Sequence, residues 1–523
     1  MLFSRTVKFS FFLLAASQIL ACGGGGGSAG SPPAPVTLPP SPPPPPAVTT
    51  DTQLRDLIAA NGLTGDPTIG RTLPSINDPL AQLGKLLFFS KSLSGDLDVA
   101  CASCHHPALG GADGLSLPVG TGAIDPDLVG PGRERPDGLP NVGRHSQTVF
   151  NVALYDSGLF WDSRVESISK EAGQNGAQSG IDTPDTAFGV ADAGLAAGTT
   201  LPDAQARFPV TVPEEMLGSF LPGADSQSIR SRLAERIGDY GAGQGELAAN
   251  NWLAEFQAAF ASALPADQLV TFDNIALAIA EYQRSMIFVD TPWKAYVDGD
   301  NSAISGDAKQ GALLFFRDTS NGGFDCVKCH SGDFFTNEEQ TVTGFPQLGP
   351  GKGDGGSGDE DFGREQLSAA TSDRFRLRTP SLLNLGATAP YTHSGVYDTL
   401  LDATGHYFIP DVIFDDFMSR GGTCSLEQFS AHPQCATIFA NLVANSEAAF
   451  DAVIQARTAD PDATFEDAST TPLSNAPLML AFLATLTDPC TLDRSCVTPW
   501  IPLPGDAPDD HQLNAIDLNG APL

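Results

Sequence analysis

The pattern Cys-x-x-Cys-His occurs twice in this chain and limits its possible folds more than any other feature. The two copies are Cys101-Ala102-Ser103-Cys104-His105 and Cys326-Val327-Lys328-Cys329-His330. Two thiols on one short turn can bind the two vinyl groups of a haem, and the histidine that follows can coordinate its iron. The alternatives are a thioredoxin-like redox pair, which needs no adjacent histidine, and half of a zinc site, which needs further ligands nearby. The repetition predicts two covalently bound haem c groups.

The other five cysteines have separate roles. Cys22 follows an apolar segment near the N-terminus, and the rest form two close pairs, Cys424 with Cys435 and Cys490 with Cys496. In an oxidising compartment such close pairs form disulfides. Four cysteines allow three pairings, among which the sequence does not select, and pairing of sequence neighbours is the simplest expectation.

The first 21 residues have the composition of an export signal. Two basic residues precede the apolar run 9–21, which is too short to span a bilayer. The run ends in Leu-Ala-Cys-Gly, which resembles a bacterial lipobox and predicts a lipid on Cys22; ordinary cleavage that leaves an unmodified thiol is the alternative. Residues 22–50 are rich in glycine and proline, as in a tether. We expect an exported protein, periplasmic or at the outer membrane, that contacts the membrane through this anchor alone.

Beyond the tether the chain is expected to divide around the two haem motifs. We place an N-terminal haem domain at 51–265, a C-terminal haem domain at 266–500 and an extended tail at 501–523. Hydrophobic periodicity or continuous apolar runs predict helices over 80–89, 229–237, 247–260, 272–288 and 472–486. The fourth of these helices is expected to begin near Asp273 as its cap. Because strand signals are few, the fold class is mainly α: two cytochrome c-like haem domains with long loops and no internal repeat beyond the haem motifs.

The charge balance excludes one class of partner and favours another. Lys and Arg total 28 against 62 Asp and Glu, a net charge of −34. A nucleic-acid binder needs a basic face, so this class is excluded. Residues 351–363 form an acidic glycine loop that lacks the features of a phosphate-binding loop. The same acidity would attract a small basic electron-transfer protein.

The distribution of histidine and methionine bears on whether the first haem is open. Between His106 and His145 the chain has neither residue type, and His106 adjoins the proximal His105. The first iron therefore has no nearby sixth ligand, which suits an enzyme that binds peroxide. The alternative is that a distant residue such as His145 closes this iron.

Several segments make the chain resemble the bacterial dihaem cytochrome c peroxidases and their relative MauG. Besides the two haem motifs in order, the matching segments are LGKLLFF at 83–89, FWDSR at 160–164, PEEMLG at 213–218, RTPSLLN at 378–384 and TAPYTHSG at 388–395. The resemblance implies an all-α dihaem protein in which the N-terminal haem meets peroxide and the C-terminal haem transfers electrons.

The resemblance also assigns two catalytic side chains. Trp161 matches the tryptophan that lies between the two haems, although a large core aromatic would also explain it. Glu215 matches the distal carboxylate, which moves a proton from one peroxide oxygen to the other, best with a pKa raised by burial. Residues 173–210, rich in Gly, Ala and Asp, look like an insertion between these two positions.

Tyr407 stands where the peroxidases have a methionine, and MauG a tyrosine, as the second ligand of the C-terminal haem. An oxygen ligand favours oxidised iron, whereas a thioether favours the reduced state. The alternatives are His406 and Met418, or a Tyr407 that merely packs in the core. The switchable distal histidine of the peroxidases falls near Thr121 here, which points to an enzyme that needs no reductive opening.

The family also has a calcium ion between its domains. Thr388 and Pro390 match its backbone-carbonyl ligands, whereas His145 stands at the position of its asparagine. Ca²⁺ prefers oxygen ligands, so the sequence leaves this ion as an expectation rather than an assignment.

These features predict a dihaem peroxidase that reduces hydrogen peroxide with electrons from a small periplasmic donor, a cytochrome c or a cupredoxin. One alternative is a MauG-like oxidase that modifies Trp or Tyr of a partner protein. A second, from another class, is a dihaem cytochrome that only carries electrons.

Overall fold

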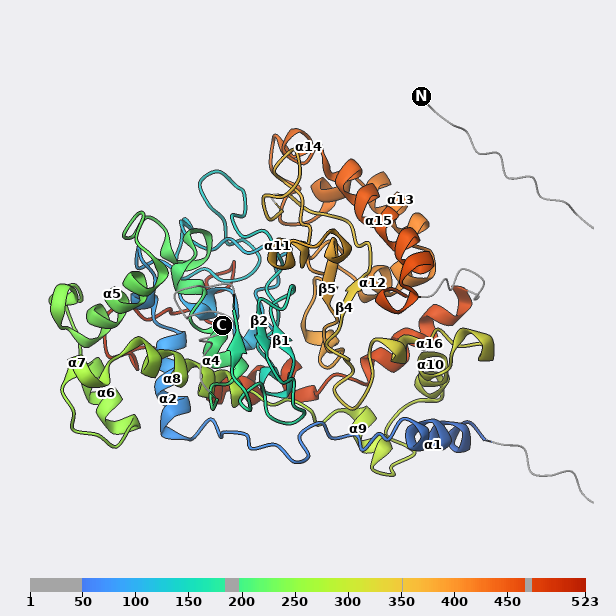
Figure 1. The fold of residues 1–523 in the computed structure, drawn as a ribbon, viewed down its shortest axis with the longest axis horizontal. Helices are drawn as coiled ribbons and strands as arrows, with labels where there is room; N and C mark the ends of the chain where they lie inside the picture. Colours follow the sequence, from blue (N-terminus) through green and yellow to red (C-terminus); the bar gives the residue numbers. More distant parts are fainter. Residues whose placement is uncertain (1–48, 184–196, 350, 466–472) are drawn as a thin grey trace, which may run out of the picture. The chain divides into compact units, whose positions relative to one another are not determined.

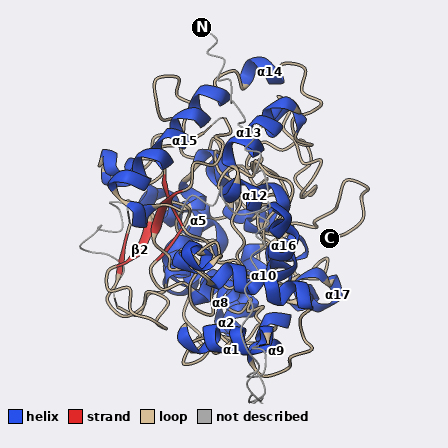
Figure 2. Cartoon of the chain, turned by 90° about the vertical axis from the view of Figure 1, so that its right-hand side faces the viewer, coloured by secondary structure: helices blue, strands red, loops and turns tan. Residues whose placement is uncertain are grey.

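The computed structural model describes residues 49–183, 197–349, 351–465 and 473–523 (Figure 1). The expected export signal, Cys22 and nearly all of the tether lie outside these residues. The described chain is mainly helical with long loops, as Figure 2 shows, and this confirms the predicted class. Among the described residues, we find no helix with the length and apolar character that a membrane crossing requires.

The longer helices are α1 (Thr50–Ala60), α2 (Pro79–Phe88), α5 (Ser226–Gly238), α6 (Trp252–Ala259), α8 (Phe272–Arg284), α10 (Gly306–Phe316), α12 (Leu400–Phe408), α13 (Pro410–Ser419), α15 (Leu442–Ala459) and α16 (Ala476–Ala484). The short helices are α4 (Leu201–Gln205), α7 (Ala266–Leu269), α9 (Pro292–Val297), α11 (Glu365–Ser368), α14 (Cys435–Ile438) and α17 (Arg494–Val497). One antiparallel sheet has the order β1 (Gly158–Leu159), β2 (Val165–Ser167), β3 (Ile181–Asp182), and another pairs β4 (Gln340–Val342) with β5 (Arg376–Arg378).

The helix α8 begins two residues earlier than its predicted cap implies. Thr271 is the N-cap, because its backbone is extended and its hydroxyl accepts a hydrogen bond from the amide of Asn274 at 3.3 Å. Asp273 lies inside the first turn and pairs instead with Arg207. The prediction of Asp273 as cap is therefore wrong.

Two equivalent helix pairs form the centres of the fold, α2 with α8 and α10 with α16 (Figure 1). Each crossing passes through a glycine. A Cβ atom on Gly84 would lie 1.9 Å from the carbonyl oxygen of Ala278, and one on Gly311 would lie 2.0 Å from that of Leu478. The glycines begin matching segments, GKLLFF at 84–89 and GALLFF at 311–316. The expectation of no further repeat is therefore wrong, because a short repeat precedes each haem motif and builds the same helix crossing.

Replacing Gly311 with alanine should lower the free energy of unfolding by about 1–3 kcal/mol, since the added methyl group forces the two backbones of the crossing apart. The matched control is Gly306→Ala on the same helix, where the added Cβ meets open space. Urea unfolding of the two haem-loaded variants measures both effects. Equal stabilities would show that α10 and α16 do not need this close approach.

The apolar side chains gather mainly in two large cores. The helices of each core do not follow one another without interruption along the chain. The first core contains side chains of α2, α5, α6 and α8, and the second contains those of α1, α9, α10 and α16. The predicted boundary after residue 265 assigns α8 to the second domain, whereas its apolar face packs on α2 in the first core. Helix α1 precedes both haem motifs but packs on α10 (Figure 1). Leu513 and Ala515, in the expected extended tail, are buried in the first core.

The structure pairs the cysteines outside the haem motifs as sequence neighbours. Cys424 bonds to Cys435 with their Cα atoms 5.8 Å apart, and Cys490 bonds to Cys496 at 5.3 Å. The four cysteines of the haem motifs, at positions 101, 104, 326 and 329, form no disulfide. Their thiols are thus available for bonds to a haem.

Candidate functional site

The first haem motif faces a cavity whose walls are mainly apolar. Cys101, Cys104 and His105 line one side of it. Nδ1 of His105 lies 3.3 Å from the carbonyl oxygen of Gly111, to which it must donate, so the other ring nitrogen keeps the lone pair that binds a metal. Apolar residues that line the rest include Phe88, Val99, Val149, Phe150, Met216 and Ile279. Two thiols, a directed imidazole and apolar walls fit a c-type haem.

The second haem motif repeats this arrangement in a second cavity. Cys326, Cys329 and His330 line it together with apolar side chains such as Phe315. Nδ1 of His330 lies 3.1 Å from the carbonyl oxygen of Phe335, which again leaves the second ring nitrogen for a metal. The residues of both cavities therefore fit the same prosthetic group.

Glu215 lies in the first cavity on the turn Pro213–Leu217. Burial raises the pKa of its carboxyl, and the positive charges of Arg164 and Lys352 oppose that rise. Thr121 holds this turn from behind: its hydroxyl donates to the carbonyl oxygen of Pro213 at 3.0 Å, and its amide donates to that of the next residue at 3.2 Å. The structure thus brings the predicted carboxylate into the cavity of His105, and Thr121 supports the turn that carries it.

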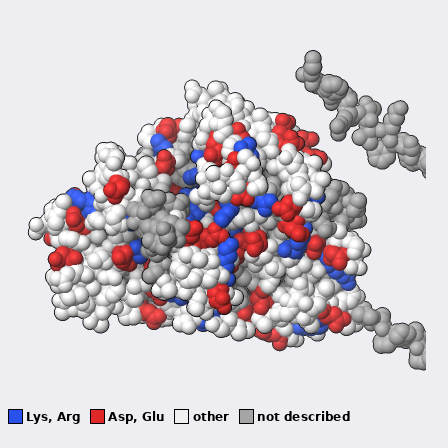
Figure 3. Space-filling view, in the orientation of Figure 1, with Lys and Arg blue, Asp and Glu red and all other residues white. Residues whose placement is uncertain are grey.

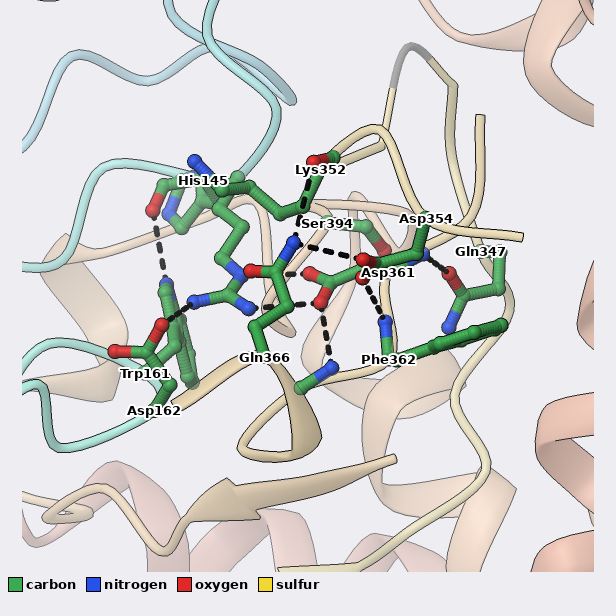
Figure 4. A network of polar contacts seen from close by, with 12 residues as sticks. His145, Trp161, Asp162, Gln347, Lys352, Asp354, Asp361, Phe362, Gln366 and Ser394 are labelled. Carbon is green, nitrogen blue, oxygen red and sulfur yellow. Dashed lines mark hydrogen bonds and ion pairs between the residues drawn. The ribbon is translucent and has the colours of Figure 1, made fainter. Parts of the chain in front are cut away.

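Trp161 lines both cavities. Its indole nitrogen donates to the carbonyl oxygen of His145 at 3.0 Å (Figure 4). Its own backbone carbonyl accepts the amide of Arg378 at 2.7 Å. Hydrogen bonds from segments on either side of Trp161 in the sequence therefore fix the ring where the two cavities meet. This placement suits a side chain that relays electrons.

The three candidate ligands for the second haem differ in their placement. Tyr407 lines the second cavity, and burial raises the pKa of its hydroxyl well above the usual value. His406 has both ring nitrogens engaged, Nδ1 with the hydroxyl of Tyr397 at 3.1 Å and Nε2 with the carbonyl oxygen of Thr343 at 2.9 Å. Met418 packs in a separate apolar cluster. Of these three, Tyr407 is the one that faces the cavity.

The second cavity also contains two groups that the sequence analysis did not weigh as ligands. His393 and Met479 both line it. His393 is buried, and its Nδ1 has no hydrogen-bond partner among the described residues. The motif TAPYTHSG includes His393, but nothing in that pattern says which cavity the imidazole faces.

Tyr407→Phe should change the absorption and electron paramagnetic resonance spectra of the second haem, because it removes the oxygen atom that is the candidate ligand of the iron. Tyr397→Phe is the control, since it also removes a buried hydroxyl but its ring does not line the cavity. Unaltered spectra for the Tyr407 variant would transfer the ligand assignment to His393 or Met479.

One residue at the expected calcium position, His145, is a poor ligand for that ion. Thr388 and Pro390 line the first cavity. His145 uses Nδ1 for a hydrogen bond to the carbonyl oxygen of Leu115 at 2.8 Å, and burial lowers the pKa of its imidazole to about 4. The described residues contain no group of three or more His, Cys, Asp or Glu that could hold a metal ion. We therefore assign calcium no step, and it stays a prediction.

A buried ion-pair network joins the first cavity to the glycine loop 351–363 (Figure 4). Arg144, which lines the cavity, donates to Asp361 from Nε at 2.6 Å and from Nη2 at 2.7 Å, and to Asp162 from Nη1 at 2.5 Å. Asp162 also accepts from Arg164 at 2.9 Å. The loop carries Lys352 into the cavity wall. Sequence analysis missed this contribution; the one signal was a single lysine in an otherwise acidic loop.

Comparisons with known proteins agree with this geometry. The family model described as di-haem cytochrome c peroxidase matches residues 78–302. The methylamine utilization protein MauG of Methylorubrum extorquens is 28% identical over 327 residues, 62% of this chain and 67% of that protein. The cytochrome c551 peroxidase of Pseudomonas aeruginosa is 28% identical over 329 residues, which are 63% of this chain and 71% of that protein.

One solved structure supports the fold. The crystal structure of a variant of the diheme peroxidase BthA from Burkholderia thailandensis has a TM-score of 0.50 and 20% identity, and the match covers 85% of this chain and 91% of that one.

Two helix pairs, each with a thiol-and-histidine cavity, define a dihaem enzyme of the c-type cytochrome class. The family model over residues 78–302 and these relatives support the family of dihaem cytochrome c peroxidases and MauG for this chain. It is accordingly an oxidoreductase of the dihaem peroxidase type, and this family implies two c-type haems.

Proposed function

We propose that the chain reduces hydrogen peroxide to water in the first cavity, with two electrons delivered through the second. The observation that carries the proposal is the partly buried carboxyl of Glu215 in the cavity that His105 and its two cysteines also line. When bound there, the haem supplies an iron that exchanges electrons with peroxide.

Glu215 manages the protons of this reaction. Its carboxylate takes the proton from one peroxide oxygen, and the resulting acid returns that proton to the other oxygen as the O–O bond breaks. Two further protons and two electrons complete the conversion of one peroxide to two waters. Burial raises the pKa of this carboxyl, which makes its carboxylate a better proton acceptor than that of an exposed glutamate.

Trp161 and the surface charge support the path of the electrons. The indole stands on the wall that the two cavities share, so it is placed to pass electrons from the second to the first. Figure 3 shows acidic side chains spread over one face of the molecule. With a net charge of −34, the chain would attract a basic donor, a small cytochrome c or cupredoxin.

A second candidate function is oxidation of Trp or Tyr in a partner protein, as in a MauG-like oxidase. Tyr407 in the wall of the second cavity favours it, because a tyrosine ligand would stabilise oxidised iron while a slower protein substrate reacts. In either case we place the protein on the exported side of the cell membrane, held by a lipid on Cys22.

The test mixes the fully oxidised holoprotein with one equivalent of hydrogen peroxide, without reductant, and follows the haem absorption. A change within milliseconds to seconds supports an open first site. If the spectrum changes only after the second haem is reduced, the enzyme is a reductively activated peroxidase. No change under either condition would overturn the proposal. Addition of a basic cytochrome c or of a tryptophan-containing partner protein to the reacted enzyme then separates the two candidate functions.

A further inference from the structure

A side chain that follows the second haem motif in the sequence holds the loop that follows the first. Gln428 lies in the segment 424–435, which the disulfide between Cys424 and Cys435 closes. Its Nε2 donates to the carbonyl oxygen of Leu117 at 2.6 Å, and its Oε1 accepts the amide hydrogen of the same residue at 3.0 Å. The side-chain amide of Gln428 thus pairs with both backbone groups of Leu117, as a residue on a neighbouring strand would.

The same segment contacts the loop at a second point. Nε2 of His432 lies 3.0 Å from the carbonyl oxygen of Asp137, and its Nδ1 accepts the amide hydrogen of Gln434 at 3.2 Å. Because Nδ1 accepts, Nε2 carries the hydrogen and donates it to Asp137. Residues 110–151, all of which the structure describes, contain no helix or strand, so contacts of this kind fix the course of the loop.

Apolar packing reinforces the contact at Leu117. This side chain is fully buried in a cluster that also contains Leu426, Phe429 and Cys435 of the disulfide-closed segment. Burial of a leucine side chain contributes about 1.5–3 kcal/mol, and a buried amide left without its acceptor costs about 1–3 kcal/mol. The segment therefore holds Leu117 by packing and by hydrogen bonds together.

The backbone after Leu117 rests directly on the turn that carries Glu215. A Cβ atom on Gly120 would lie 2.0 Å from the carbonyl oxygen of Glu214, so the two backbones touch there. The amide of Thr121 donates to the same oxygen at 3.2 Å. Because only three residues separate Leu117 from Thr121, a displacement of Leu117 is passed to the support of this turn.

The turn has a second anchor, at which the carbonyl oxygen of Met216 accepts the amide hydrogen of Gly95 at 2.8 Å. Glu215 therefore lies between two fixed points, one of which depends on Gln428. A carboxyl that takes a proton and returns it must stay within hydrogen-bond reach of the reacting atoms. A misplacement of about 1 Å, even when it arises far from the reaction, can slow catalysis by about 10²-fold.

We propose that Gln428 is a positioning residue for Glu215. Through Leu117 and Thr121 it fixes the turn that carries this carboxyl, so a segment that follows the second haem motif sets the geometry of proton transfer in the first cavity. The inference rests on the proposed function and deepens it, because it concerns the residue to which we assign that transfer.

The test is a double-mutant cycle in the haem-loaded full chain, in which the haem absorption gives the rate of reaction with hydrogen peroxide. Gln428→Met keeps the length of the side chain but removes both hydrogen bonds, and it should slow the reaction about tenfold. In the Glu215→Gln background the same change should alter the rate by less than about twofold, because its effect passes through the missing carboxyl. Gln434→Met, at an exposed position of the same segment, is the matched control and should leave the rate unaltered.

Hydrogen–deuterium exchange supplies a readout that is independent of the reaction. Peptides that cover residues 115–122 and 213–218 should exchange several-fold faster in Gln428→Met than in wild type, because the loop and the turn open more often. The Gln434→Met control should exchange at the rates of wild type. If Gln428→Met does not retain two haems, Gln428→Glu replaces it in both experiments, since it keeps the size of the side chain but cannot donate to Leu117.

The contrary outcomes are distinct. If Gln428→Met slows the reaction by the same factor in both backgrounds, or leaves either the rate or the exchange unchanged, the positioning role of Gln428 is overturned. The slow reaction of Glu215→Gln alone then still upholds the proposed function. If Glu215→Gln reacts with peroxide as fast as wild type, the proton transfer assigned to Glu215 and the role of Gln428 fall together.

Discussion

Glu215→Gln should slow the reaction of the oxidised holoprotein with hydrogen peroxide by about 10²–10⁴-fold, the usual contribution of a positioned acid–base group. Glutamine keeps the size of the side chain and its place in the first cavity, but its amide cannot accept a proton and return it. Both haems should stay attached, because Glu215 does not belong to either haem motif. Stopped-flow absorption gives the rate, and the pyridine haemochrome spectrum gives the haem content.

Glu214→Gln provides the control for this experiment. Glu214 precedes Glu215 on the same turn but is exposed and does not line the cavity. Its replacement should leave the rate of the peroxide reaction within about twofold of wild type, since substitutions of exposed residues outside the site have small effects. Equal rates for the Glu215 variant and wild type would remove Glu215 from the proton transfer.

Arg144→Met should destabilise the protein by about 3–5 kcal/mol, the cost of removing one partner from a buried ion pair. Arg144 is 6% exposed, and the carboxylates of Asp162 and Asp361 that it contacts are 1% and 4% exposed. Without the guanidinium, both carboxylates lose their main counter-charge, although Asp162 keeps Arg164. Urea unfolding of the haem-loaded protein at neutral pH measures the loss.

The control for Arg144 is an ion pair at the surface. Arg420→Met removes the partner of Asp416 on α13, and both side chains of that pair are about half exposed or more, at 47% and 56%. Such exposed ion pairs contribute about 0–1 kcal/mol to the free energy of unfolding. If Arg144→Met and Arg420→Met lose similar amounts of stability, burial does not make the Arg144 ion pairs more important than a surface pair.

The effect of Arg144 should also depend on pH. Burial alone would raise the pKa of Asp361, but Arg144 outweighs it and lowers the pKa to about 2. An aspartate in the unfolded chain has a pKa of about 3.9, so this carboxylate stabilises the fold fully above about pH 4 and loses that contribution as the pH falls through 2. The difference between wild type and Arg144→Met should therefore shrink in acid.

The sequence was sufficient for those parts of the site that depend on local chemistry. The Cys-x-x-Cys-His spacing places thiols and imidazole on one turn whatever the rest of the chain does, so both cavities were predictable. The segments around Trp161 and Glu215 were found by resemblance, and the structure places both residues in the wall of the first cavity. The mainly helical class followed from the scarcity of strand patterns.

The parts that the sequence did not reveal depend on contacts between distant segments. Lys352 is far from His105 along the chain, and only the fold brings its loop against Gly143. The close approach at Gly84 depends on which residue of α8 faces it, so the glycine alone did not identify a repeat. Likewise, α8 belongs to the first core because it packs on α2. Hydrophobic periodicity predicts the helix and its apolar face, but not the helix on which that face packs.

The two cores are interleaved along the chain, and this affects whether the chain can be divided into separately folding parts. A cut after residue 265 would separate α8 from α2 and leave α1 without α10, so each fragment would expose an apolar face that the other normally covers. Neither haem-binding unit is therefore an autonomous module. Damage to one core is therefore expected to destabilise the packing around both haems.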